Sequence, residues 1–510
     1  MGDDSSTVFE VFKGGSVVFV GLIAELAISF VAKVVIARFL GREIYGGVSL
    51  GITMMSVVSV FTLLGLNSGV ARYLPRYDTP ERRRGVILSA FQIVVPLSIA
   101  LSIVIFVSAE WIATVLFGDP GITAILRVFA LIIPLTSVVR LTISSVQGMK
   151  HTVPKVYIKN LSLPICRFAG VGVAIYLGLY GLGVAGAYAF SYAVATTLSV
   201  WYLYRSTPLF DRDVVPVGVH RELLTFSLPL LVSAASWLIF SDLDTFMLGY
   251  FSQTGDVGVY NTVYPLAELL TIALGSLGFV ATPVFSELHA GEEFGLFSHV
   301  YEILTKWVYL ATFPVLTVFV LFPRTVIQIT FGAEYAVGAA SLVVLSTAFF
   351  SHAVAGPNSN ALTAIGKTRL IMYDNAAVAA VNFALNIVLI PRYSVLGAAA
   401  ATAVAYVLLN VLYSYQLYQV TGIVPVSRSL LLAAATGGIL GLGLNVLSVV
   451  LIGTGAVRLL LFVALFAPTY TLIAVRFGVT ADEIELFLEI EDRLDMDLTP
   501  IRILGRYLVD

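Results

Sequence analysis

The chain has 510 residues, of which 58% are hydrophobic and 12% are charged, and its mean hydropathy is +0.95. Soluble globular proteins are about 45–50% apolar and about 25% charged, so this chain has too few polar side chains to cover a water-soluble body of its length. The same figures exclude an intrinsically disordered chain. The composition therefore predicts an all-α protein that crosses a membrane many times.

Charge and motifs exclude several further classes of protein. The net charge of −2 has no basic excess that would indicate a nucleic-acid partner. Cys166 is the only cysteine, so a disulfide or a cysteine-based metal site within one chain is excluded. Gly366-Lys367-Thr368 resembles the end of a nucleotide-binding loop, but Ala361 stands where that motif requires glycine. We expect no metal, no nucleotide, no enzymatic activity and no cofactor, with Na⁺ or H⁺ left open as a coupling ion.

Apolar runs of membrane-crossing length follow one another along the whole chain. A helix needs about 20 apolar residues to cross a hydrocarbon core of about 30 Å. Fourteen runs meet this requirement: 15–37, 46–66, 86–108, 123–145, 157–178, 182–204, 225–250, 258–284, 303–322, 336–357, 371–390, 396–418, 429–451 and 457–476. The sequence therefore predicts about 14 transmembrane helices joined by short connections.

The basic residues predict the orientation of these helices. Of the 29 Lys and Arg residues, 20 fall on the side of the membrane that carries the N-terminus and five on the opposite side, while four lie inside the runs. Positive charge favours the cytoplasmic face. We therefore expect a multi-pass protein of the plasma membrane with both termini in the cytoplasm.

Helices 1–6 recur as helices 7–12. At an offset of 214 residues, Phe117-Gly118 matches Phe331-Gly332 after the third and ninth runs. Further pairs with this offset lie along the sixth and twelfth runs: Gly183 and Gly397, Ala185 and Ala399, Ala187 and Ala401, Tyr192 and Tyr406, and Tyr204 and Tyr418. A duplication of six helices gives two lobes inserted the same way up, which is typical of transporters that bind substrate between the lobes.

The duplication divides the chain into five segments. We expect a six-helix lobe over residues 1–205, a cytoplasmic connection over 206–224 and a second six-helix lobe over 225–420. Helices 13 and 14 occupy 428–476, and an acidic cytoplasmic tail follows over 477–510.

Ionisable residues inside the first lobe are mostly cationic. Glu25, Lys33, Arg140 and Arg167 lie at membrane depth, whereas Arg127 is near the outer end of its helix, where its side chain can reach the surface. A charge at bilayer depth costs about 2.5–3.5 kcal/mol and usually faces a cavity or a partner. These residues are candidates for binding a phosphate and saccharide, because guanidinium groups suit phosphate. The alternative is a structural pair between Glu25 and Lys33 or Arg167.

The second lobe carries acidic and amide side chains instead. Asp242, Asp244, Glu268, Asn382 and Asn386 are candidates for binding a coupling ion, and the two asparagines lie one turn apart on one helix face. The alternative is that the acids cap helices or pair with neighbours. His352 in the tenth run is expected to be a hydrogen-bonded polar residue rather than a proton carrier.

Several short motifs occur in an order that resembles one family. Ala37–Gly46 resembles the signature that follows helix 1 of polysaccharide flippases. Other matching segments follow in order: Gly65–Tyr73, Asp244–Gly249, Val257–Asn261, Phe331–Gly332, Gly366–Lys367 and Leu396–Ala399. The chain resembles the oligosaccharidyl-lipid flippases of the multidrug/oligosaccharidyl-lipid/polysaccharide exporter superfamily over most of residues 10–420.

This resemblance implies two six-helix lobes in a V-shaped arrangement and a flippase that works by alternating access. Its substrate would be a polyprenyl- or dolichyl-phosphate-linked saccharide, moved from the cytoplasmic to the outer leaflet for surface polysaccharide or for protein N-glycosylation, as in an S-layer glycan. Some relatives bind a cation between an acid on helix 7 and polar groups on helix 11, which by position are Asp242 or Asp244 with Asn382 and Asn386. Implied partners are membrane lipids, glycosyltransferases and an oligosaccharyltransferase.

Two other functions stay open from the sequence. One is a cation-coupled multidrug or small-solute antiporter of the same superfamily, and the other is a membrane-embedded glycosyltransferase. The cationic first lobe disfavours drug cations as substrates. The scarcity of lysine, with seven Lys against 22 Arg, points to an archaeal source.

Overall fold

The computed structural model describes residues 3–151, 153–423, 428–453 and 455–478, so the predicted acidic tail lies outside the described residues from position 479 onward. Within these ranges the regular structure is helical and no strand occurs. The chain divides into two compact units. Unit 1 comprises Met1–Thr262 and Asn386–Ala398, and unit 2 comprises Val263–Leu385 and Ala399–Asp510.

Unit 1 is built from the helices that begin the chain. They are α1 (Asp3–Leu63), α2 (Leu66–Tyr73), α3 (Pro80–Trp111), α4 (Thr123–Gly148), α5 (Val153–Lys155), α6 (Leu163–Tyr176), α7 (Tyr180–Ser206), α8 (His220–Phe251) and the first part of α9 (Thr254–Glu268). Two segments are π-helical, η2 (Ile112–Leu116) and η4 (Val156–Ser162). Three short 3₁₀ turns complete the unit: η1 (Leu74–Arg76), η3 (Pro120–Ile122) and η5 (Pro208–Phe210).

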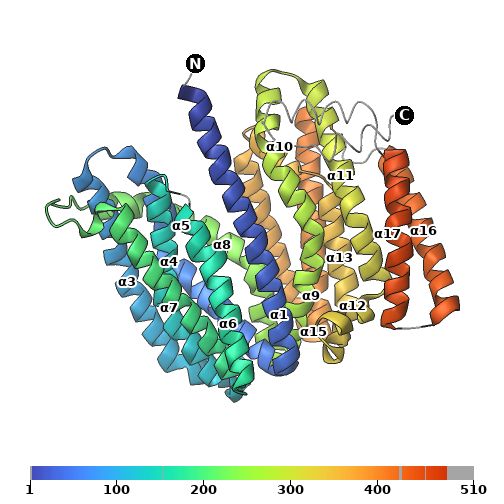
Figure 1. Ribbon diagram of the computed structural model, residues 1–510, viewed down its shortest axis with the longest axis horizontal. Helices are drawn as coiled ribbons and strands as arrows, with labels where there is room; N and C mark the ends of the chain where they lie inside the picture. Colours follow the sequence, from blue (N-terminus) through green and yellow to red (C-terminus); the bar gives the residue numbers. More distant parts are fainter. Residues whose placement is uncertain (1–2, 152, 424–427, 454, 479–510) are drawn as a thin grey trace. The chain divides into compact units, whose positions relative to one another are not determined.

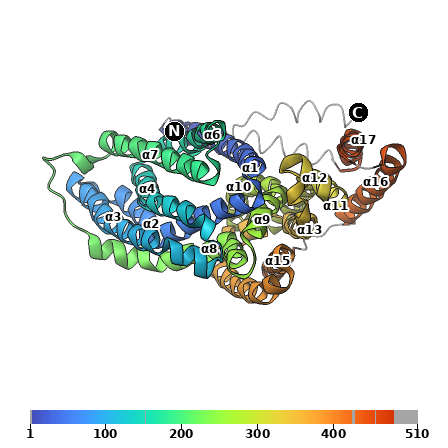
Figure 2. The ribbon, with the colours of Figure 1, turned by 90° about the horizontal axis from the view of Figure 1, so that it is seen from below.

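Helix α4 is the centre of unit 1. It packs against α1, α3 and α7, and Figures 1 and 2 both draw it between α3 and α7. One core cluster gathers buried apolar side chains of α1, α2, η1, α3, α4, α7 and α8: Leu63, Leu66, Val70, Leu74, Val86, Ile87, Ala90, Val94, Leu141, Leu203 and Leu223. A second cluster joins α4 to η4, α6 and α7 through Val139, Ile143, Ile158, Leu163 and Ala195. These contacts hold η4 beside the central helix.

Unit 2 contains the later helices. They are α10 (Ile272–Ala290), α11 (Phe294–Leu321), α12 (Pro323–Thr330), α13 (Ala339–Val354), α14 (Asn358–Ala364), most of α15 (Thr368–Thr421), α16 (Arg428–Ile452) and α17 (Ala456–Gly478). The 3₁₀ turns η6 (Leu269–Thr271) and η7 (Ala333–Gly338) precede α10 and α13. Arg458 of α17 lies over the Phe322 ring at 4.7 Å and donates through Nε to Ser448 Oγ of α16 at 3.2 Å. Arg458 therefore links α17 to α16 through this hydrogen bond.

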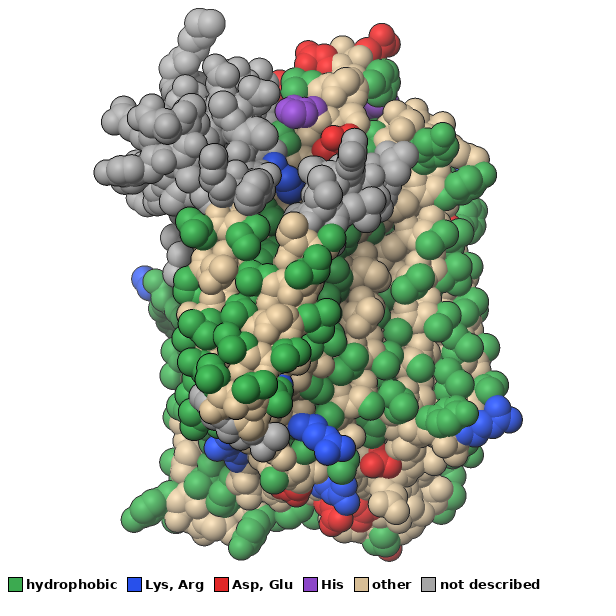
Figure 3. Space-filling model, turned by 90° about the vertical axis from the view of Figure 1, so that its right-hand side faces the viewer, with side chains coloured by type: hydrophobic (Ala, Val, Ile, Leu, Met, Phe, Trp, Pro, Cys, Tyr) green, Lys and Arg blue, Asp and Glu red, His purple; other side chains and the backbone are tan. Residues whose placement is uncertain are grey.

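The membrane-crossing character predicted from the sequence is confirmed. Nine helices in the described part of the chain are long and apolar enough to cross a membrane, or ten if the pair Leu22–Leu63 and Leu66–Arg76, bent by 49°, counts as one span. On the face drawn in Figure 3, which carries α16 and α17, hydrophobic side chains cover the middle, and charged side chains lie toward the two ends.

Two of the longest helices each hold two predicted spans. Helix α1 is kinked at Gly41, with φ 75°, between the predicted runs 15–37 and 46–66. Helix α15 is kinked at Ser394, with φ 46°, between the runs 371–390 and 396–418. Both turns lie where the sequence places them, and glycine adopts the positive φ at the first without steric cost. The helix order is consistent with fourteen spans, a number that stays a prediction.

The internal repeat has a matching local structure in the two units. Phe117 and Phe331 are both buried at the end of a helical segment. Each is followed by a glycine in a positive-φ conformation, Gly118 at 64° and Gly332 at 118°. Because positive φ values favour glycine, a glycine follows the buried phenylalanine at the end of a helical segment in both units.

Candidate functional site

The only predicted phosphate-site acid, Glu25, lies on α1 opposite the π-helical segment η4. Lys159 Nζ of η4 is 4.0 Å from Glu25 Oε1, and the side chains are 49% and 22% exposed. The expected structural alternative paired Glu25 with Lys33 or Arg167. The ion pair instead joins Glu25 to Lys159, a residue that sequence reasoning grouped with the cytoplasmic cations. Lys159 contacts α1 because η4 packs against that helix. No local sequence motif predicts this packing.

Arg167 of α6 lies against an aromatic ring rather than against an acid. Its guanidinium carbon is 4.1 Å from the centre of the Tyr188 ring of α7. Its Nε atom is buried and has no hydrogen-bond partner among the described residues. A cation over a ring gains about 0.5–2 kcal/mol. The charge of Arg167 is therefore stabilised without a carboxylate.

The other two predicted cations lie on neighbouring helices of unit 1. Lys33 is exposed on α1, and Arg140 is half-buried on α4, and these two helices pack together. In the described part of the chain Arg140 forms no hydrogen bond or ion pair that joins it to Lys33 or Arg167. The predicted cations Lys33, Arg140 and Arg167, together with Lys159, thus lie on four different segments of unit 1, which are α1, α4, α6 and η4.

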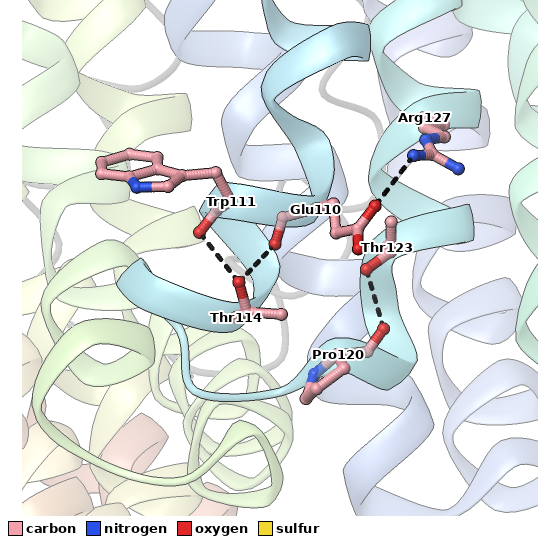
Figure 4. A network of polar contacts seen from close by, with 6 residues as sticks. All are labelled: Glu110, Trp111, Thr114, Pro120, Thr123 and Arg127. Atoms are coloured by element: carbon pink, nitrogen blue, oxygen red, sulfur yellow. Dashed lines mark hydrogen bonds and ion pairs between the residues drawn. The ribbon is translucent and has the colours of Figure 1, made fainter.

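Arg127 differs from these cations because it has an exposed acidic partner. Figure 4 shows its guanidinium directed from α4 toward Glu110 of α3, with 3.5 Å between Nη2 and Oε2. The two side chains are 42% and 72% exposed. Exposed pairs of this kind contribute about 0–1 kcal/mol. Its place agrees with the expectation that Arg127 reaches the surface.

The acidic site is centred on Asp244 of α8, a buried residue that is 4% exposed. Tyr260 of α9 donates its hydroxyl to Asp244 Oδ2 at 2.5 Å. Asn386 of α15 donates through Nδ2 to Oδ1 at 2.6 Å. All three residues belong to unit 1. The structure therefore brings together two of the predicted ion-site residues and adds Tyr260.

Close backbone packing positions Tyr260. A Cβ atom on Gly258 would collide with the carbonyl oxygen of Arg42, and one on Gly46 would collide with the carbonyl oxygen of Thr254. Glycine at both places lets the start of α9 lie against α1. Asn261 also donates through Nδ2 to Thr245 Oγ1 at 3.3 Å. The α8–α9 turn is thereby held so that Tyr260 faces Asp244.

Comparison with known proteins assigns the chain to a family. The family described as "Polysaccharide biosynthesis protein" matches residues 11–289, more than half of the chain. The chain belongs to this polysaccharide biosynthesis family. A relative in Haloferax volcanii, named "Probable low-salt glycan biosynthesis flippase Agl15", is 24% identical over 403 residues, covering 78% of this chain and 82% of the relative.

Solved structures show the fold of this polysaccharide biosynthesis protein. The lipid II flippase MurJ in an inward closed conformation matches with a TM-score of 0.69 and 13% identity, covering 91% of this chain and 99% of MurJ. An inward-facing multidrug resistance MATE family transporter of the MOP superfamily matches with a TM-score of 0.64 and 13% identity, covering 78% of this chain and 95% of the transporter. The chain therefore shares its fold with MurJ and with this MATE transporter, as the sequence resemblance implied.

The remaining ion-site candidates of the polysaccharide biosynthesis protein lie in different surroundings. Asp242 is half-buried, Asn382 is 3% exposed on α15, and Glu268 is exposed where α9 gives way to η6. Tyr260 was not singled out from the sequence as a site residue, although it lies in the segment Val257–Asn261 that carries the family resemblance. An ion-site search restricted to charged and amide side chains misses a phenol.

His352 behaves as the sequence predicts. Its Nδ1 atom is 2.9 Å from Asn410 Oδ1, and Asn410 donates through Nδ2 to the carbonyl oxygen of Tyr406 at 2.7 Å. Because the amide NH₂ is committed to that carbonyl, the Asn410 oxygen faces the imidazole, and the hydrogen-bonding role of Nδ1 is that of a donor.

Proposed function

We propose that this protein is a flippase that moves a polyprenyl- or dolichyl-phosphate-linked saccharide from the cytoplasmic to the outer leaflet by alternating access. The observation that carries the proposal is the set of basic side chains inside the membrane-spanning helices of unit 1, in a member of the polysaccharide biosynthesis family. Lys33, Arg140 and Arg167 are charges that the membrane disfavours unless they serve a cavity or a partner. A phosphate-linked lipid supplies the complementary charge.

Ion coupling is assigned to the acidic site. Asp244, Tyr260 and Asn386 offer a carboxylate, a phenol and an amide, and oxygen atoms of these types bind Na⁺, while a carboxylate also takes up H⁺. A change of occupancy would alter the hydrogen bonds that join α8, α9 and α15. Asp242, Glu268 and Asn382 are secondary candidates for the same coupling function.

The biological setting follows from the substrate class. The flipped saccharide would serve surface polysaccharide or protein N-glycosylation, including S-layer glycan of an archaeal cell. Glycosyltransferases and an oligosaccharyltransferase of the same pathway would act before and after it. The protein would lie in the plasma membrane with both termini in the cytoplasm, as the excess of basic residues on one side predicts. The named flippase in Haloferax volcanii supports this setting.

Deletion of the gene tests the proposal directly. A lipid-linked saccharide should accumulate on the cytoplasmic leaflet, and the corresponding surface glycan should disappear. Mass spectrometry identifies the accumulated lipid, and protection from an added membrane-impermeant glycosidase in right-side-out vesicles reports its leaflet. Unchanged lipid-linked intermediates together with an unchanged surface glycan would contradict the proposed function.

A cation-coupled multidrug or small-solute antiporter is the second candidate. The fold shared with a multidrug resistance transporter favours it. The basic side chains of unit 1 argue against cationic drugs as substrates, because like charges repel. Efflux of a cationic dye from proteoliposomes, with no movement of polyprenyl diphosphates, would support this candidate over the flippase.

A further inference from the structure

The ion pair between Glu25 and Lys159 is loose and accessible. Its atoms are 4.0 Å apart, and half of the lysine side chain is exposed. Among the described residues Glu25 is the one acidic partner of Lys159, whose ammonium group carries three donors. A pair with this geometry leaves the cation able to take another oxygen ligand.

Buried acceptors next to the pair also lack donors. Asn160 is 2% exposed, and its Oδ1 atom has no hydrogen-bond partner in the described part of the chain. Glu25 Oε2 is likewise buried and has no hydrogen-bond partner among the described residues. Buried polar atoms are nearly always hydrogen-bonded, and exceptions call for an explanation such as a function or an absent ligand. One of these two atoms belongs to the carboxylate that pairs with Lys159, and the other belongs to the residue that follows Lys159 in η4.

The backbone at Lys159 has an unusual form. Segment η4 is π-helical over the seven residues Val156–Ser162. Such turns are rare and occur often at functional sites. The segment packs against α1, α6 and α7, so Lys159 and Asn160 lie at a widened turn beside the helix that carries Glu25.

The energetics favour a ligand-binding use of this lysine. Lys159 lies near the start of the candidate span Val153–Tyr176. A charge in contact with lipid is costly, so the half-exposed ammonium group of Lys159 is expected to face water or an anion. A phosphodiester carries one negative charge, as a carboxylate does, and a diphosphate diester carries two, with acceptor oxygens on each phosphate. Either group would compete with Glu25 for the same ammonium group.

We propose that Lys159 binds the phosphate of the transported lipid and that Glu25 is the counterion displaced when this phosphate binds. The inference rests on the proposed flippase function, because it takes a phosphate-bearing lipid as the ligand. It assigns opposite effects to the two partners. Lys159 stabilises the bound state, whereas Glu25 stabilises the empty state and weakens binding.

The test measures binding of farnesyl diphosphate, inorganic pyrophosphate and farnesol to the full-length protein in detergent by isothermal titration calorimetry. Lys159→Gln should raise the Kd for farnesyl diphosphate about tenfold, which corresponds to about 1.4 kcal/mol. Glu25→Gln should lower the Kd about threefold, since it removes the competitor. Lys159→Arg should bind within about threefold of the wild type because the charge is kept.

A neighbouring lysine supplies the matched control. Lys155 lies four residues before Lys159 and is half-buried in α5, and Lys155→Gln should leave the Kd unchanged. Equal binding of inorganic pyrophosphate and farnesyl diphosphate would assign recognition to the diphosphate alone, and stronger binding of the lipid would add a prenyl contact. Either result supports the role of Lys159 if Lys159→Gln weakens the binding and Lys159→Arg does not.

Other outcomes overturn the inference. A purely structural pair predicts that Glu25→Gln and Lys159→Gln shift the Kd in the same direction and lower the melting temperature together. If Lys159→Gln does not fold, tighter binding by Glu25→Gln supports the proposal, and unchanged or weaker binding contradicts it. If the wild-type protein binds no diphosphate, the proposed phosphate-lipid substrate is contradicted as well. If the wild type binds and Lys159→Gln has the same Kd, only the inference about Lys159 is contradicted.

Discussion

Glu25 and Asp244 are carboxylates of unit 1 that the sequence places at membrane depth, and they differ in exposure and in their partners. Glu25 meets one lysine at 4.0 Å and is 22% exposed. Asp244 is 4% exposed and accepts hydrogen bonds of 2.5 and 2.6 Å from Tyr260 and Asn386. The first carboxylate neutralises an accessible cation, and the second is enclosed by short hydrogen bonds.

The difference indicates what each place can bind. A loose ion pair with a half-exposed lysine exchanges its partner at lower cost than a tight, buried pair, because less interaction energy is lost. A buried carboxylate loses its hydration and depends on the donors around it. We therefore expect the Glu25–Lys159 pair (the open site) to bind a large anionic ligand, and the group of Asp244, Tyr260 and Asn386 (the closed site) to bind a small cation or a proton.

Loss of the Asp244 charge should have the largest effect. We expect Asp244→Asn to abolish the stimulation of lipid flipping by a Na⁺ or H⁺ gradient and to slow gradient-driven flipping at least about tenfold, or about 1.4 kcal/mol. Flipping of a fluorescent polyprenyl diphosphate in proteoliposomes measures this rate. Asp242→Asn, a change of the same kind two residues away, should have a smaller effect. Undiminished gradient stimulation in Asp244→Asn would remove the distinction between the two carboxylates.

Disturbing the backbone beside the closed site should cost stability without touching the open site. Gly258→Val would place side-chain atoms against the carbonyl of Arg42, and overpacking of this kind costs about 1–3 kcal/mol. Thermal unfolding in detergent should show a lower melting temperature, while the affinity for farnesyl diphosphate stays close to that of the wild type. Gly172→Val is the control, because a Cβ there has open space around it. A wild-type melting temperature for Gly258→Val would show that α9 does not need this approach.

Removal of one donor should weaken the hydrogen bonding of the closed site while the carboxylate stays in place. Tyr260→Phe deletes the hydroxyl that donates to Asp244, and a hydrogen bond to a charged group contributes about 1.5–3 kcal/mol. The expected result is a lower melting temperature and altered ion dependence of flipping, with the charge of Asp244 retained. Tyr264→Phe, four residues further along α9, is the comparison variant. Identical ion dependence in Tyr260→Phe and the wild type would exclude the phenol from the coupling site.

The smallest effect is expected at the exposed pair drawn in Figure 4. Arg127→Gln should change the free energy of unfolding by less than about 1 kcal/mol, because both partners are largely solvated. It should also leave diphosphate binding unchanged, unlike Lys159→Gln. A large loss of binding in Arg127→Gln would show that exposed and membrane-depth cations act together.

The sequence by itself determined the class of fold and the location of its bends. Apolar runs of about 20 residues dictate transmembrane helices, because backbone groups in lipid must be hydrogen-bonded within the helix. The turns at Gly41 and Ser394 lie at breaks between the predicted runs, and the glycine of each repeated Phe-Gly pair has a positive φ. These features are local along the chain, so the sequence alone predicts them.

Only the tertiary structure decided which charges have which partners. Asp244 and Asn386 are 142 residues apart, and Glu25 and Lys159 are 134 residues apart in the sequence. Their distances depend on how α8, α9 and α15 pack, and on how the π-helical segment η4 packs against α1. Such contacts arise from the summed packing of several helices, whereas a sequence motif records only the residues of one segment.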